Sequence, residues 1–281
     1  MTPPSSQEPQ TSAVVTFENV RIGFDEEDVL RGVSLEVLPR ETLVLLGETG
    51  TGKTLTLKLA AGLLRPTQGK IEVLGQEVSA MSERELLPYR RQVGFVFQEG
   101  ALFDSLSVGE NVAYQLREDR LDEEEIEQRV QEALHFVELE HTGDMLPSEL
   151  SGGMRRRVSI ARALAARPPI VLYDSPTAGL DPVTAQTIIT LILRLRDVFG
   201  VTAMLATHRL QDGFALANFR FDPEFKRVVR LTEKEGSVPA TGGNPEPITR
   251  FVVYREGRVY FEGGPEELAE SKDAYLQRFL V

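Results

Sequence analysis

The chain has 281 residues, of which 41% are hydrophobic and 26% charged, with a formal net charge of −12. This length supports one large or two modest domains with a hydrophobic core, and the composition is that of a soluble globular protein. The acidic charge argues against a general nucleic-acid binder, which needs a basic surface. The absence of cysteine excludes disulfides and thiolate metal sites, and a cytosolic location is consistent with it.

Residues 1–13 contain neither a basic segment nor an apolar core. They are therefore no signal peptide, and we expect a disordered tail. The longest apolar runs fall far short of the roughly 20 residues that a membrane helix needs. Any role at a membrane must come through a partner.

The first predicted elements are strands. Residues 13–24 and 29–37 alternate between apolar and polar side chains, as half-buried strands do. The run "TLVLLG" (42–47) is continuously apolar, which favours a strand buried on both faces. Residues 54–64 then have the spacing of a helix, and residues 65–78 return to a turn and a strand.

A mostly helical region is predicted over residues 82–166. Its clearest helix starts near Asp122, a candidate N-cap residue. Glu125 is placed to complete a capping box, and Leu121 is placed to pack on Ile126.

Strands are predicted at 170–173 and 201–206, with a helix over 183–199 between them and a short helix after His208. Alternating strands and helices imply a parallel sheet with helical crossovers. The fold class is therefore α/β.

The last part of the chain is predicted to end in a hairpin over 249–264 and a helix over 265–271. Residues 219–248 are rich in Gly, Pro and charge towards their end. We interpret them as an insertion made of a small hairpin and a mobile loop, within a single domain spanning 14–281.

The stretch "GETGTGKT", Gly47 to Thr54, follows the apolar strand and matches the pattern G-x-x-x-x-G-K-[ST]. Its glycines allow backbone N–H groups to point at phosphate oxygens, and the following helix adds a partial positive charge. Lys53 is expected to reach the β- and γ-phosphates of ATP, and Thr54 to ligate Mg²⁺. The alternative, a turn that merely joins strand to helix, is disfavoured by the complete motif. The predicted nucleotide contacts are Gly47, Glu48, Thr49, Gly50, Thr51, Gly52, Lys53, Thr54 and Leu55.

Asp174 ends the predicted strand "IVLYD". A carboxylate there would be costly to bury without a charged partner. Mg²⁺ supplies such a partner, so Asp174 joins Lys53 and Thr54 in the predicted site.

At this point the chain resembles the ATP-binding cassette (ABC) family. The stretch "ELSGGMRRRVSIARAL" (149–164) is similar to the family signature. Its first residues open a helix whose free N–H groups form a second anion site. The resemblance implies that this motif completes the ATP site of another subunit, so that a homodimer encloses two ATP molecules. A plain N-capped basic helix is the alternative. The residues concerned are Ser151, Gly152, Gly153 and Met154.

Further positions match family motifs. Gln98 resembles the glutamine that senses Mg²⁺ and contacts the membrane partner, and Asp181 lies in "AGLD", which resembles the loop that crosses the dimer interface. His208 resembles the switch histidine near the γ-phosphate, with an ordinary core or surface histidine as the alternative. Phe24 occupies the position of the aromatic residue that stacks on adenine, with a core phenylalanine as the alternative.

The resemblance implies a P-loop NTPase (RecA-like) core with a parallel sheet, an antiparallel β subdomain and an inserted α-helical subdomain at about 99–166. "MLPSELSGGM" and the ending "YLQRFLV" narrow the resemblance to the ATPases of bacterial Mla/MCE-type phospholipid transporters. This narrower resemblance implies a homodimer on the inner face of the cell membrane. The dimer would bind an integral-membrane permease that works with an MCE-type lipid-binding protein. Residues 98–107 are expected to dock on the permease, because they place apolar residues in a loop.

Ser175 departs from the family, which has glutamate at this position to polarise the attacking water. A serine hydroxyl accepts no proton at neutral pH, and loss of a positioned base costs on the order of 10²–10⁴ in rate. Because phosphoryl transfer relies mostly on positioning and charge neutralisation, slow hydrolysis is expected rather than none. Glu99 is a candidate substitute acid.

Two functions follow from these features. One is an ATPase subunit that powers lipid transport, and the other is an ATP-gated binding module that closes on ATP and hardly hydrolyses it. A cassette acting on DNA or ribosomes is a distant third possibility, because the charge is acidic and no second cassette is present. Single-turnover ATP hydrolysis with the permease present separates the first two.

Overall fold

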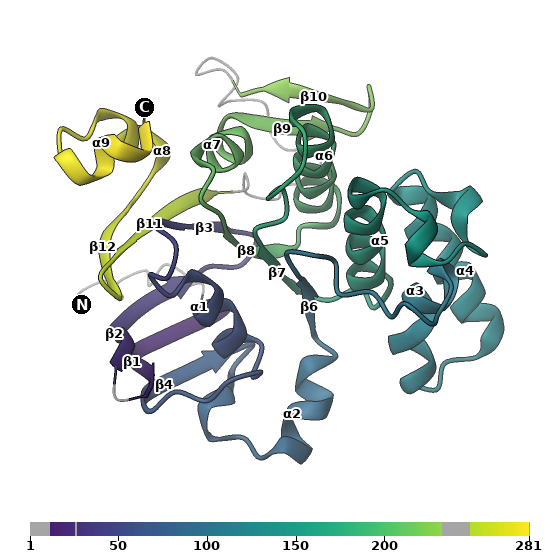
Figure 1. Cartoon of the computed structure of the whole chain (residues 1–281), viewed down its shortest axis with the longest axis horizontal. Helices are drawn as coiled ribbons and strands as arrows, with labels where there is room; N and C mark the ends of the chain where they lie inside the picture. Colours follow the sequence, from purple (N-terminus) through teal and green to yellow (C-terminus); the bar gives the residue numbers. More distant parts are fainter. Residues whose placement is uncertain (1–11, 26, 232–247, 281) are drawn as a thin grey trace, which may run out of the picture.

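The structure, a computed structural model, describes residues 12–25, 27–231 and 248–280. Its centre is a six-stranded sheet in the order β12-β11-β3-β8-β7-β6 (Figure 1). Five of the strands run parallel, and β12 pairs antiparallel with β11 at one edge. The strands are β3 (Thr42–Gly47), β6 (Val93–Val96), β7 (Ile170–Asp174), β8 (Thr202–Ala206), β11 (Thr249–Arg255) and β12 (Arg258–Gly263).

A second sheet, which is antiparallel, has the order β2-β1-β4-β5. It lies next to the first, with helix α1 beside both (Figure 1). Its strands are β1 (Val15–Phe24), β2 (Glu27–Val37), β4 (Gln68–Val73) and β5 (Gln76–Glu77). The alternation of apolar residues in β1 and β2 follows from this arrangement, because only one face of the sheet is buried.

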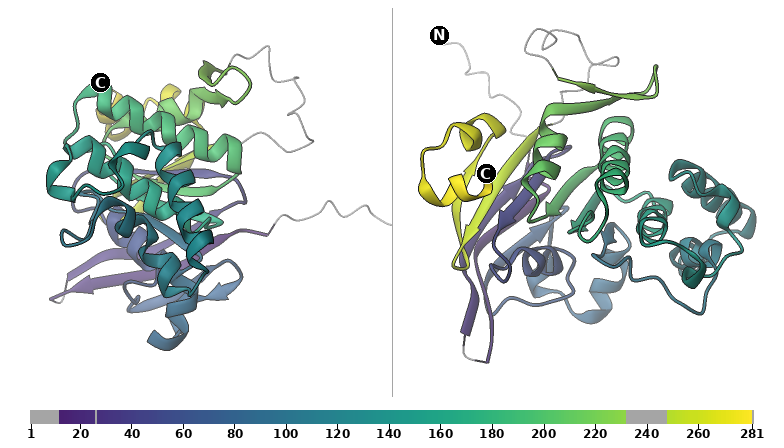
Figure 2. Two further views of the ribbon diagram at one scale, coloured as in Figure 1. Left: turned by 90° about the vertical axis from the view of Figure 1, so that its right-hand side faces the viewer. Right: turned by 45° about the horizontal axis from the view of Figure 1, so that its top comes forward.

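The helices are connected to these strands in the order expected of an α/β fold. They are α1 (Lys53–Ala60), α2 (Glu83–Arg90), α3 (Val108–Glu118), α4 (Glu123–Phe136), α5 (Gly152–Ala165), α6 (Pro182–Phe199), α7 (Leu210–Asn218), α8 (Pro265–Glu270) and α9 (Ala274–Leu280). Short 3₁₀ helices lie at Val78–Ala80, Glu140–Thr142 and Pro147–Glu149. Helices α3, α4 and α5 pack together at one side of the molecule (Figure 2).

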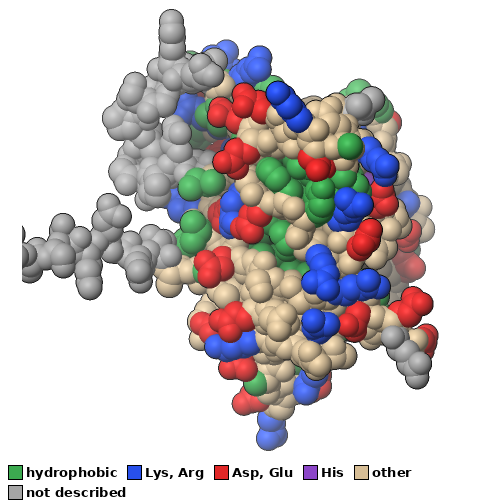
Figure 3. All heavy atoms as spheres, turned by 90° about the vertical axis from the view of Figure 1, so that its left-hand side faces the viewer, with side chains coloured by type: hydrophobic (Ala, Val, Ile, Leu, Met, Phe, Trp, Pro, Cys, Tyr) green, Lys and Arg blue, Asp and Glu red, His purple; other side chains and the backbone are tan. Residues whose placement is uncertain are grey.

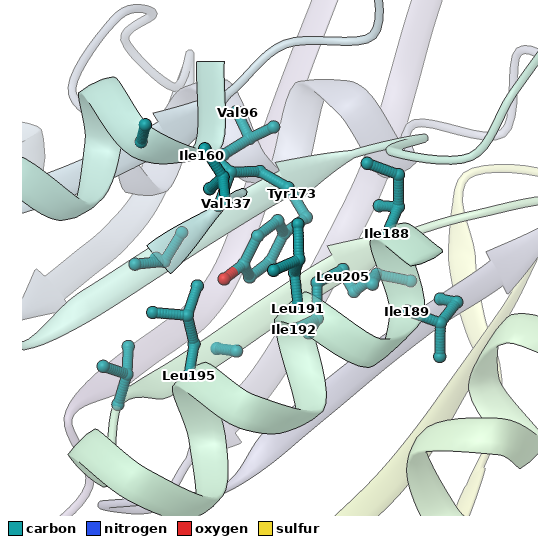
Figure 4. Close-up of a cluster of buried hydrophobic side chains, with 14 of the residues drawn as sticks. Val96, Val137, Ile160, Tyr173, Ile188, Ile189, Leu191, Ile192, Leu195 and Leu205 are labelled. Carbon is teal, nitrogen blue, oxygen red and sulfur yellow. The ribbon is translucent and has the colours of Figure 1, made fainter. Parts of the chain in front are cut away.

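The central sheet separates two hydrophobic cores. Strand β3 is buried along its whole length, because its alternate side chains enter different cores. Leu45 joins the core shared with α1 and the antiparallel sheet, and Leu46 joins the core shared with α5 and α6. In this second core Tyr173 is surrounded by side chains of α5 and α6 (Figure 4).

The α/β class and the parallel sheet predicted from the sequence are confirmed. The hairpin at the start of the insertion is also confirmed, as β9 (Phe219–Asp222) paired with β10 (Arg227–Arg230). Strand β9 of this hairpin lies beside α6 (Figure 2). The predicted hairpin β11–β12 and helix α8 are present too. The predicted mobile loop falls on 232–247 and most of the predicted tail on 1–11, both outside the described residues.

Some details of the helical prediction are wrong. Asp122 is the N-cap residue of α4, but its side chain makes no capping hydrogen bond, so the capping box with Glu125 is not formed. The region 82–166 is mostly helical as predicted, but it also contains the strand β6, whose four residues are too short to show a clear period. Helix α1 ends at Ala60, earlier than the spacing indicated, and α9 had not been predicted.

The surface carries both signs of charge. On the face that includes α9 and β12, acidic and basic side chains border a group of apolar side chains (Figure 3). Within the ranges that the structure describes, no helix is long and apolar enough to cross a membrane.

Candidate nucleotide site

The loop between β3 and α1 has the shape that phosphate binding needs. Gly47, Gly50 and Gly52 all have positive φ angles, so the chain curls between the strand and the helix. Gly52, the N-cap residue of α1, has a φ of 104°, and a Cβ atom there would lie 2.1 Å from Cδ2 of Leu30. Only glycine satisfies both constraints. The N–H groups of the first turn of α1 thus face the inside of the loop.

Lys53 places its charge inside this loop. Its side chain is buried, and Nζ donates hydrogen bonds to the carbonyl oxygens of Gly47 at 2.8 Å and Glu48 at 2.7 Å. Burial lowers the pKa of Lys53, and the negative charge of Asp174 opposes that shift. An ammonium group has three N–H donors, so one remains to bind a phosphate oxygen.

Thr54 and Asp174 meet at the end of the sheet. The Thr54 hydroxyl donates to Oδ1 of Asp174 at 2.9 Å, and the Asp174 side chain is buried at the end of β7. Hydroxyl and carboxylate oxygens are ligands that Mg²⁺ accepts, usually together with the phosphates of a nucleotide. The described residues contain no cluster of three His, Cys, Asp or Glu that could hold a metal alone. The donor set therefore fits a Mg²⁺ ion bound jointly with ATP.

Ser175 directly follows the end of β7. It has a φ of 47°, in the left-handed region that non-glycine residues seldom adopt. Its N–H donates to the carbonyl of Ala206 at 2.8 Å, and its Oγ lies 3.5 Å from Oδ1 of Asp174. The position after the strand thus presents a short hydroxyl beside Asp174 and no carboxylate.

Arg156 on α5 binds the loop that begins at Ser175, a contact that sequence reasoning missed. Its guanidinium donates to the carbonyls of Ser175 at 3.0 Å, Pro176 at 2.8 Å and Ala178 at 3.4 Å. Burial lowers the pKa of Arg156, while the charges of Glu99 and Asp174 raise it. The run of three arginines at 155–157 was the only sequence signal, and it could not show which of them points inward.

Asp212 on α7 joins this loop to the one after β8. Its Oδ2 accepts hydrogen bonds from the hydroxyls of Thr177 and Thr207, the second at 3.2 Å. Burial raises the pKa of Asp212, whereas the Thr177 hydrogen bond and Arg209 lower it. His208, next to Thr207, is exposed at this end of the sheet. Sequence reasoning missed Asp212 because one acid within a short helix has no distinctive pattern.

The predicted signature residues form a capped helix start. The Ser151 hydroxyl accepts a hydrogen bond from the Met154 N–H at 3.2 Å, and α5 begins at Gly152. A Cβ at Gly153 would lie 2.4 Å from Cγ2 of Thr184, so glycine permits the close approach of α6.

Asp181 has a similar local role at the start of α6, where it accepts from the N–H groups of Val183 and Thr184. Helices α1 and α5 pack on opposite faces of the central sheet, because Leu57 of α1 belongs to one core and Val158 of α5 to the other.

The remaining candidates lie on the surface. Gln98 and Glu99 are exposed just after β6. Phe24 is 51% exposed at the end of β1, so it is not the core phenylalanine considered as an alternative. Leu102 had been expected on an exposed loop, but it is half-buried and packs against the core, whereas Phe103 is exposed.

Comparisons with known proteins identify the family of this chain. Residues 30–178 match the family described as ABC transporter, a range that takes in the phosphate loop, the signature and Asp174. The chain belongs to the ABC transporter family. It is similar to the intermembrane phospholipid transport system ATP-binding protein MlaF of Haemophilus influenzae, with 35% identity covering 95% of this chain and 90% of that protein.

This chain is also similar to the methionine import ATP-binding protein MetN of Brucella abortus, with 36% identity covering 87% of this chain and 66% of that protein. Among solved structures it resembles a dimeric post-hydrolysis state of the ATP-binding cassette MJ0796 bound to ADP and Pi. That match has a TM-score of 0.72 and 29% identity, and covers 89% of this chain and 98% of the other. The chain is therefore an ABC ATPase subunit with a P-loop NTPase fold.

Proposed function

We propose that this ATPase powers phospholipid transport through an integral-membrane permease, with an MCE-type lipid-binding protein as a further partner. The observation that carries the proposal is the extent of the similarity to MlaF, which takes in nearly all of both chains. MetN has almost the same identity, but the match covers only 66% of its length. Phospholipid is therefore the favoured substrate class and methionine the alternative.

The proposed working form is a homodimer that encloses two ATP molecules. Each chain has two glycine-containing helix N-termini, at α1 and α5, that we propose as anion sites, and the two helices lie on opposite faces of the sheet. In the proposed dimer, each chain supplies its signature helix to the phosphate loop of the other. The dimeric cassette MJ0796 supports this arrangement.

The proposed nucleotide contacts follow from the geometry. The Lys53 ammonium and the N–H groups of the loop bind phosphate oxygens, and the exposed ring of Phe24 is available to stack on adenine. Thr54 and Asp174, with Gln98, are the residues proposed to hold Mg²⁺, which neutralises charge on the β- and γ-phosphates when bound. His208 is proposed to contact the γ-phosphate from the loop after β8.

Slow hydrolysis is proposed because Ser175 offers no base. Its hydroxyl lies near Asp174, and Asp174 itself accepts from Thr54. The attacking water would be positioned mainly by groups that orient it rather than by one that accepts its proton. The alternative function, a binding module that closes on ATP and hardly hydrolyses it, depends on the same residue, Ser175.

The proposed docking surface for the permease is the groove beside Phe103. The rings of Phe103 and Tyr114 are 4.6 Å apart and both are exposed. They line a cavity of about 310 Å³ together with Arg162, which also binds the carbonyl oxygens of Gly100 and Ala101. Exposed aromatic side chains beside a fixed loop are typical of partner sites. Docking here would place the ATPase on the inner face of the cell membrane.

The substrate class is tested with the cassette and its permease in proteoliposomes. ATP-dependent transfer of a fluorescent phospholipid is expected, and the Lys53→Ala complex should transfer none. If the same vesicles took up methionine and transferred no lipid, phospholipid would be excluded as the substrate in favour of methionine.

Docking is tested separately with Phe103→Glu and Tyr114→Glu. Both variants should bind ATP as the wild type does and fail to co-purify with the permease, because a charge replaces an apolar contact. Phe225→Glu is the matched control, since Phe225 is 63% exposed on the distant β9–β10 hairpin. Co-purification of the Phe103 and Tyr114 variants at wild-type yield would exclude this groove.

A further inference from the structure

We propose that Arg156 is a positioning residue for ATP hydrolysis, which fixes the loop Ser175–Ala178 to the signature helix α5. The loop carries the position at which the attacking water would be activated. Arg156 lies in the first half of α5, and the residue is only 6% exposed. Its guanidinium crosses from α5 to the loop and ends among backbone carbonyl oxygens.

The contact suits arginine in particular. Three carbonyl oxygens, those of Ser175, Pro176 and Ala178, accept from the two Nη atoms at 2.8–3.4 Å. A guanidinium is planar and presents five donors in a rigid fork, so it can hold several carbonyls in one fixed arrangement. A lysine ammonium has the same charge but no fork, and would hold the loop less tightly. Burying the cation is costly, and the charges of Glu99 and Asp174 compensate in part.

The loop is held from three elements. The Ser175 N–H binds Ala206 at the end of β8, and the Thr177 hydroxyl binds Asp212 on α7. Arg156 makes the contact from α5, the helix whose N-terminus carries Ser151 and Gly152. The Arg156 hydrogen bonds therefore connect the position of the signature helix to the backbone of Ser175, whose left-handed conformation needs support from its neighbours.

The neighbouring arginine provides a matched control. Arg157 donates to the carbonyl of Val137 at 3.0 Å, so it ties α5 to the end of α4 and not to the loop. Arg156→Gln and Arg157→Gln remove the same charge from adjacent positions of one helix. Any general effect on the helix should appear in both variants, and an effect on the loop should appear only in the first.

The experiment measures single-turnover ATP hydrolysis, ATP affinity and hydrogen exchange of the full-length chain. In Arg156→Gln we expect the hydrolysis rate to fall about tenfold or more, because small misplacements of reacting groups cost up to roughly 10²-fold. ATP affinity should stay within about threefold, since Arg156 contacts no predicted phosphate ligand. Amide exchange over residues 175–181 should become faster. Arg156→Lys should lie between the wild type and Arg156→Gln.

A slower Arg156→Gln enzyme with unchanged exchange in this loop would overturn the proposal, and so would faster exchange with an unchanged rate. Equal losses in Arg156→Gln and Arg157→Gln would show a general effect on α5 and would overturn it too. If thermal unfolding shows that Arg156→Gln does not fold, Arg156→Lys provides the same comparison. Its exchange and rate must then both change for the proposal to stand.

Discussion

Thr54 and Asp174 are joined by a hydrogen bond of 2.9 Å across 120 positions of sequence. The contact arises because β3 and β7 are both neighbours of β8 in a parallel sheet, so their carboxyl ends lie at the same edge. Ligands of open α/β sheets bind outside the carboxyl ends of the strands, which is where this pair lies.

Lys53→Ala should weaken ATP binding by at least about tenfold, because the substitution removes a charge-assisted hydrogen bond to phosphate. Calorimetric titration with Mg²⁺·ATP measures the affinity. Lys58→Ala is the control, since Lys58 lies on the same helix but in its last turn. Equal affinities for the two variants would remove Lys53 from the site.

Ser175→Glu should speed ATP hydrolysis about tenfold or more, because it adds the missing proton acceptor next to Asp174. Ser175→Ala should change the rate little, since the serine hydroxyl offers only weak orientation of water. Phosphate release by the three proteins, with the permease present, measures both effects. An inactive Ser175→Ala enzyme would show that the serine itself takes part in catalysis. If Ser175→Glu gave no gain in rate, the general base would lie elsewhere, and Glu99 and His208 would be the residues to test.

Cysteines at Thr49 and Gly152 should cross-link two chains only when nucleotide is present. Both positions are exposed, and a Cβ at Gly152 would meet nothing nearer than 3.9 Å. The chain has no cysteine of its own, so every cross-link formed comes from the engineered pair. Cysteines at Thr49 and Arg84 serve as the control. Non-reducing electrophoresis that shows equal dimer with and without ATP would contradict the closed homodimer.

The stability of the wild type relative to Asp212→Asn should fall as pH rises above the ordinary aspartate pKa of 3.8. Burial raises the pKa of Asp212, so the folded protein holds its proton more tightly than the unfolded chain does. Stability then decreases with pH wherever the folded state binds more protons. Thermal unfolding of both proteins from about pH 4 to 7 measures the difference.

Asp273→Asn is the control for this pH dependence. Hydrogen bonds from Tyr260 and the backbone lower the pKa of Asp273, so its contribution is lost only below the ordinary value of 3.8. The difference between wild type and Asp273→Asn should therefore be flat over the same range. A flat profile for Asp212→Asn as well would show that Asp212 is not held in a protonation-sensitive position.

Much of the site could be predicted from local sequence. The phosphate loop depends on glycine positions, a lysine and a threonine within eight residues, and its conformation is dictated by those residues and the strand before them. Asp174 was predictable because an acid at the end of a buried apolar strand needs a charged partner. The sequence also shows directly that position 175 holds serine and not glutamate.

Only the tertiary structure revealed the contacts that hold the Ser175 loop. Arg156 and Asp212 come from two helices distant in sequence from the phosphate loop, and their residue types occur often on helix surfaces. Which arginine of three turns inward depends on how α5 packs on the sheet. The burial of Leu102 was likewise decided by packing.

The sequence by itself predicted the candidate nucleotide site and determined the fold class, because the phosphate loop and the alternation of strands and helices are local patterns. The tertiary structure decided which side chains support that site. Those contacts depend on the order of strands in the sheet and on the rotation of each helix, and no single segment of the chain encodes either.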